Sequence, residues 1–185
     1  MAEHGRIQND EIKKRNTHGE KKQCCAEPFD ATTVVQEETE AKYEAERRRP
    51  WLVIFTGESR TGEGATGYAV TWKKEGTQGP NMMSMYDAAI ARALETAARR
   101  RKKLGHLTIF TDAQAAIRGM TPDDPRPGRK YAIADRKHVA ELRCREPEIS
   151  IEIRWCPSHC EIEGNEKADE WAKLAADEPD SHGVV

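Results

Sequence analysis

The segment from Ile149 to Ala176 constrains the fold of this 185-residue chain more than any other part of it. Apolar and polar residues alternate over 149–155, which predicts a half-buried strand. A loop with His159 follows, and from residue 165 the apolar residues recur at i, i+3, i+4 and i+7, the spacing of an amphipathic helix. Asp169 lies in the first turn of that helix. It is therefore expected at the boundary between core and solvent, where a carboxylate can meet a metal ion.

Upstream of this segment the sequence predicts further strands and helices. Apolar or alternating runs predict an antiparallel pair, a third strand and a fourth that ends at Asp112, over residues 51–56, 68–72, 81–85 and 107–111. Helical spacing predicts helices over residues 86–97, 113–117 and 130–144. Asp112 then stands at the carboxyl end of a strand, which is where open α/β sheets bind ligands.

The composition indicates that part of the chain is not packed, because 34% of its residues are charged and only 37% are hydrophobic. Residues 1–49 have few aliphatic side chains, so we predict a largely disordered tail with a marginal helix near 35–49. One domain is expected over residues 50–177, followed by a frayed end over 178–185. The net charge of −2 means that contacts with phosphate must come from a local patch.

Such a patch is present in a run of five cations after the predicted helix over 86–97: Arg99, Arg100, Arg101, Lys102 and Lys103. These side chains either bind phosphates or complement the negative end of that helix.

The five cysteines are odd in number and irregularly spaced, and the first residues of the sequence do not form the apolar segment that is typical of a signal peptide. We therefore expect a reduced, intracellular protein of the nucleus or cytoplasm, not a secreted one. The longest apolar run is too short to span a bilayer, so no membrane role is expected.

Two stretches resemble the ribonuclease H type 1 family, and in particular the domains attached to reverse transcriptases of non-LTR retroelements. One runs from Trp155 to Asp169 and the other from Thr108 to Ala116, and the similarity covers about residues 50–176. The resemblance implies an α/β, ribonuclease H-like fold: a mixed five-stranded sheet, with three antiparallel then two parallel strands, flanked by helices. It also implies four carboxylates that hold Mg²⁺ or Mn²⁺, and hydrolysis of the RNA strand of an RNA–DNA hybrid.

Two of the four carboxylate positions match the family, and two are altered. Asp112 and Asp169 correspond to the third and fourth. Gly57 stands where the family has its first aspartate, and the neighbouring Glu58 would need a bulge to replace it, because side chains alternate along a strand. The helix glutamate has no direct counterpart, and Asp87 is the nearest carboxylate.

Other residues of the motif carry weaker expectations. By resemblance, His159 assists proton transfer or product release, although an exposed loop histidine without a role is the alternative. Asn165 either contacts nucleic acid or starts the helix. Cys156, His159 and Cys160 also allow a zinc site, but they lack a second ligand pair unless the tail supplies one.

The leading hypothesis is a domain that binds RNA–DNA hybrid and, if its carboxylates suffice, hydrolyses the RNA strand with Mg²⁺ or Mn²⁺. The alternative is a catalytically inactive, nucleic-acid-binding remnant of a retroelement reverse transcriptase. A transposase or integrase is disfavoured because those enzymes also need the first aspartate. The expected partner is hybrid or duplex nucleic acid, and the expected oligomeric state is a monomer.

Overall fold

The computed structural model describes residues 30–72, 89–120 and 129–177. These residues form one five-stranded mixed sheet of order β1-β5-β4-β2-β3. The strands are β1 (Thr32–Val34), β2 (Leu52–Arg60), β3 (Thr66–Trp72), β4 (His106–Thr111) and β5 (Ser150–Trp155). The helices are α1 (Glu38–Glu46), α2 (Ala89–Ala98), α3 (Gln114–Gly119), α4 (Arg129–Arg145) and α5 (Glu163–Asp177).

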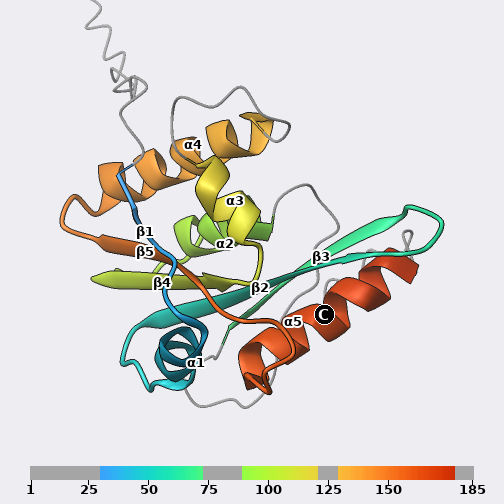
Figure 1. Cartoon of the computed structure of the whole chain (residues 1–185). Coiled ribbons are helices and arrows are strands. Elements are labelled where there is room, and N and C mark those ends of the chain that lie inside the picture. Colours follow the sequence, from blue (N-terminus) through green and yellow to red (C-terminus); the bar gives the residue numbers. More distant parts are fainter. Residues whose placement is uncertain (1–29, 73–88, 121–128, 178–185) are drawn as a thin grey trace, which may run out of the picture.

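Helices cover both faces of the sheet, as Figure 1 shows: α2, α3 and α4 lie on one side, and α1 and α5 lie on the other. The alternation of strand side chains explains this layering. Leu52, Ile54, Leu107 and Ile109 belong to the larger core, which also contains the apolar face of α2. Phe55 and Phe110 point the other way and stack at 5.1 Å, in a smaller core that also contains Ala168 of α5.

The predicted fold class is confirmed. Strands β2 and β3 pair antiparallel, whereas β2–β4, β4–β5 and β5–β1 are parallel. The third strand of the predicted antiparallel group, residues 81–85, lies outside the described residues. The fifth strand of the observed sheet is instead β1, which pairs with β5 at the edge. The remaining predicted strands and helices are present with boundaries shifted by a few residues.

Residues 30–49 differ from the predicted, largely disordered tail. They form β1 and α1, and only the marginal helix near 35–49 was anticipated. The sheet edge and the polar side chains of β5 hold this segment, because Arg154 donates a hydrogen bond to Gln36 at 2.6 Å. Partners that distant in the chain leave no signal in local composition.

Two further expectations concern cysteines and membranes. Cys156 and Cys160 are free thiols, but Cys144 is disulfide-bonded, so the expectation of reduced cysteines is wrong for this residue. Cysteine spacing could not reveal this, because disulfide pairing depends on tertiary contacts.

Within the described ranges, every helix is too short or too polar to cross a bilayer.

Candidate functional site

The end of β4 places Asp112 at the carboxyl edge of the sheet, beside the end of β5. The backbone N–H of Cys156 donates to the carbonyl of Thr111 at 2.9 Å, and the indole N–H of Trp155 donates to the carbonyl of Asp112 at 3.1 Å. These bonds hold the backbone where β4 leaves the sheet. The Asp112 side chain is half-buried there.

Helix α5 brings Asp169 to the same edge. Asp169 is only 6% exposed. Its Oδ2 accepts a hydrogen bond from Asn165 Nδ2 at 3.5 Å, and the Sγ–H of Cys156 donates to Asn165 Oδ1 at 3.3 Å. Its Oδ1 is buried and has no hydrogen-bond partner among the described residues. A chain of buried polar groups thus connects the end of β5 to the carboxylate on α5.

Gly57 lies at the point where these two acids meet. In the parallel register Thr56 is opposite Thr111, so Gly57 is level with Asp112 on the neighbouring strand. A Cβ atom built on Gly57 would be 2.7 Å from Asp169 Oδ1. Residue 57 therefore stands between Asp112 and Asp169, where the resemblance places the first aspartate, and it has no side chain.

Burial raises the pKa of both carboxyl groups at this edge. Burial raises the pKa of Asp169 to about 6, and the charge of Asp112 adds to the shift. Burial also raises the pKa of Asp112, whereas the nearby His159 lowers it. His159 likewise lowers the pKa of Asp169. Asp112, Asp169 and His159 are thus within electrostatic reach of one another, as expected of one site.

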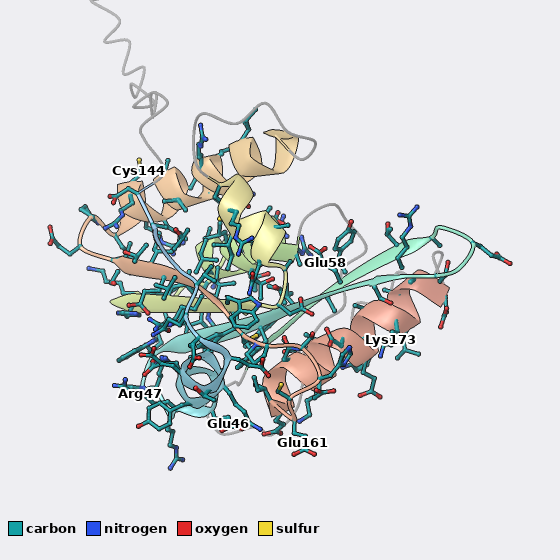
Figure 2. All side chains as sticks on the ribbon, in the orientation of Figure 1. Glu46, Arg47, Glu58, Cys144, Glu161 and Lys173 are labelled. Carbon is teal, nitrogen blue, oxygen red and sulfur yellow. The ribbon has the colours of Figure 1, made fainter. Side chains whose placement is uncertain are left out.

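The loop before α5 carries His159 on a backbone that side chains rarely adopt. His159 has φ 56° and Glu161 has φ 61°, both in the left-handed region. Figure 2 labels Glu161 in this loop, next to the start of α5. The His159 side chain is exposed, so it can reach a bound molecule. Its catalytic role stays a prediction.

Of the two weaker carboxylate candidates, only Glu58 is described, and it does not turn toward the site. Glu58 lies on the face of β2 opposite to Gly57, and Figure 2 shows it on the side of the strand away from α5. Shielding of its carboxyl from solvent raises the pKa of Glu58, with a smaller effect from Asp112, although the residue as a whole is exposed. No bulge turns Glu58 toward Asp169, because its pairing with Tyr68 is regular. Asp87 lies outside the described residues.

The predicted nucleic-acid contacts occupy two different environments. Residues 99–103 lie in the connection between α2 and β4, and Arg101, Lys102 and Lys103 are exposed. Arg99 is paired with Glu95 at 2.5 Å. Asn165, by contrast, is 0% exposed. Its side chain forms hydrogen bonds with Cys156 and Asp169 inside the protein. Asn165 is therefore not available to contact nucleic acid, and this prediction is corrected.

The described residues do not fit the two-ion centre that the resemblance implies. Among them no group of three or more His, Cys, Asp or Glu side chains could hold a metal ion, and this also argues against the zinc alternative for Cys156, His159 and Cys160. The unpaired Oδ1 of Asp169 would suit a cation, but it lies against Gly57, where a further carboxylate would be needed. Two acids alone leave a pair of ions without enough ligands.

Comparison with known proteins gives structural likenesses of low sequence identity. No family model matches the chain, and no curated protein matches it. A ribonuclease H1 isolated from compost by a metagenomic approach has a TM-score of 0.48 and 19% identity, covering 71% of this chain and 99% of its own. The N-terminal ribonuclease H domain of a Mycobacterium tuberculosis protein has a TM-score of 0.46 and 15% identity, covering 68% of this chain and 93% of its own. The protease-reverse transcriptase of prototype foamy virus has a TM-score of 0.44 and 19% identity, covering 70% of this chain and 21% of its own.

Proposed function

We propose that this chain is a ribonuclease H-like domain that binds RNA–DNA hybrid or duplex nucleic acid without efficient cleavage of the RNA strand. The observation that carries the proposal is the position of Gly57 between Asp112 and Asp169. Hydrolysis by two metal ions needs several carboxylates converging on one point. In this chain the carboxylate expected at residue 57 is missing, because that residue is a glycine.

Binding is supported by the motifs that resemble ribonuclease H and by the exposed cations near the amino end of β4. Lys and Arg side chains supply affinity for the phosphate backbone independently of sequence. A hybrid would be recognised through its backbone shape and its 2′-hydroxyl groups. In this proposal the domain acts as a monomer and derives from a retroelement reverse transcriptase.

A second candidate function is weak, metal-dependent hydrolysis of the RNA strand. One observation favours it: Asp112 and His159 are close enough to Asp169 for both of their charges to act on its pKa. Substrate phosphate could then contribute ligands to a single Mg²⁺ or Mn²⁺ ion. Each lost metal contact removes several kcal/mol of transition-state stabilisation, so we expect a rate on the order of a thousandfold or more below that of a complete site.

The test combines a binding and a cleavage measurement on the full chain. Fluorescence anisotropy with a labelled RNA–DNA hybrid should show saturable binding. Gel analysis of the same hybrid with Mg²⁺ or Mn²⁺ should show no product, or very slow formation of one. Asp112→Asn is the matched control, because it removes a charge from the site and keeps its shape. Efficient cleavage abolished by Asp112→Asn would establish the enzyme and overturn the proposal, and absence of binding to both hybrid and duplex would overturn it as well.

A further inference from the structure

The space beside Gly57 is occupied by the backbone of helix α5. A Cβ atom on Gly57 would lie 2.6 Å from the carbonyl carbon of Ala168, 2.7 Å from the amide nitrogen of Asp169 and 2.7 Å from its Oδ1. Real Cβ atoms essentially never come this close to other heavy atoms. Two of the three obstacles belong to the main chain of a helix, which cannot move aside by rotating a side chain.

A second glycine shows that this close approach extends along the helix. A Cβ atom on Gly67, in the neighbouring strand β3, would collide with the backbone of α5 at Ala172 and Ala176. Gly57 and Gly67 lie on the same face of the antiparallel pair, because Gly57 is opposite Ala69 and Gly67 is opposite Ser59. Helix α5 therefore rests on the strand backbones at two points, and its position is fixed by more than one contact.

We infer that the first carboxylate position is closed, so that no side chain fits at residue 57 while α5 keeps its place. Gly57 is then the point at which helix α5 packs against strand β2. Asp169 is a positioning residue of that contact, held by Asn165 and the thiol of Cys156. Restoring the aspartate by Gly57→Asp would displace α5 and would not rebuild a metal centre. This inference deepens the proposed function, and only its cleavage measurement rests on that function.

Thermal unfolding of single variants tests the contact. Overpacking a well-packed site destabilises the folded state, so Gly57→Ala should lower Tm by about 3 to 12 °C, and Gly57→Asp by more. Gly62→Ala is the matched control, because a Cβ at Gly62 has no atom within 4 Å, and its Tm should stay within about 1 °C. The inference would be overturned if both Gly57→Ala and Gly57→Asp had the same Tm as the parent chain.

A double variant separates the helix backbone from the Asp169 side chain. Asp169→Ala removes only Oδ1 from the three obstacles, so the Tm losses of Gly57→Ala and Asp169→Ala should add. The backbone contact would be refuted if the double variant had a Tm equal to or above that of Asp169→Ala. That result would mean that the Asp169 carboxylate alone filled the space beside Gly57.

The cleavage measurement distinguishes this inference from the proposed function. Gly57→Asp should give no hybrid cleavage with Mg²⁺ or Mn²⁺, even at temperatures where it is folded by circular dichroism. Cleavage gained by a stable Gly57→Asp variant would refute the closed position and leave binding by the parent chain intact. Cleavage by the parent chain would instead refute the proposed function, whatever the Tm values of the variants.

Discussion

Asp135 carries a buried carboxyl group that lies apart from the acidic site. The residue is only 3% exposed, and its Oδ1 has no hydrogen-bond partner in the part of the chain that the structure describes. Burial raises the pKa of Asp135 to about 7. The charged form is costly there because burial removes the carboxylate from water and Oδ1 gains no hydrogen bond from the described residues in exchange. This single residue should therefore link folding to pH.

The pH dependence follows from the direction of that shift. Because the folded pKa lies above the unfolded value, the carboxyl favours folding most below about pH 4, and this stabilisation is lost as pH rises to about 7. We expect the free energy of unfolding to fall by about 1–4 kcal/mol over this range through Asp135. Urea titrations at several pH values should show a flatter profile for Asp135→Asn. Glu141→Gln, an exposed change on the same helix, should keep the profile of the parent, and equal slopes in all three proteins would contradict the prediction.

Helix α1 is attached to the sheet by ion pairs more than by apolar contacts. Glu44 accepts a hydrogen bond from Arg49 at 2.6 Å and lies 3.9 Å from Arg154 of β5. The Arg49 side chain is 3% exposed, and its guanidinium lies over the ring of Phe110 at 5.1 Å. Glu44 thus neutralises a buried cation, which is otherwise expensive to keep away from water.

Removing that carboxylate should loosen the helix. Glu44→Gln keeps the size of the side chain but leaves Arg49 without its counter-charge, so we expect a loss of about 1–3 kcal/mol in the free energy of unfolding. Glu46→Gln serves as the control, because its pair with Lys42 at 3.8 Å is exposed and should contribute at most about 0.5 kcal/mol. Urea denaturation measures both. Equal effects of the two substitutions would show that burial of Arg49 does not depend on Glu44.

At the scale of the whole molecule, the acidic site and the cationic connection lie at opposite ends of β4. The strand runs from His106 to Thr111, so the connection over residues 99–105 and Asp112 are separated by roughly 20 Å along it. One phosphate cannot contact both. A bound duplex would have to extend along the strand direction to meet the cations as well as the acids.

The salt dependence of binding tests whether the cations take part. Each phosphate contact contributes about 0.9 to the slope of log K against log salt concentration for a duplex. Arg101→Gln combined with Lys103→Gln should weaken hybrid binding and reduce that slope by up to about 2. Lys42→Gln on α1 should leave the slope unchanged. An unaltered slope in the double variant would locate the binding surface elsewhere.

Local patterns in the chain were enough to predict most elements and the place of Asp112 after a strand. Asp169 was expected in the first turn of its helix, but α5 begins at Glu163, so Asp169 lies in the second turn. Period-two alternation over 149–155 and helical spacing after residue 165 depend only on which side chains are apolar, and the packed structure preserves both. The replacement at Gly57 could also be read from the sequence, because residue 57 lies at a position where the resembling family has an aspartate.

Packing decided the rest. Strand β1 is held by its pairing with the edge of β5, and its three residues are too few to show an alternating pattern in the sequence. The internal bonds of Asn165 depend on how β5 and α5 meet, and so does the contact of α5 with Gly57. Sequence spacing specifies which face a side chain takes, but only the approach distance between helix and sheet determines whether there is room for another atom.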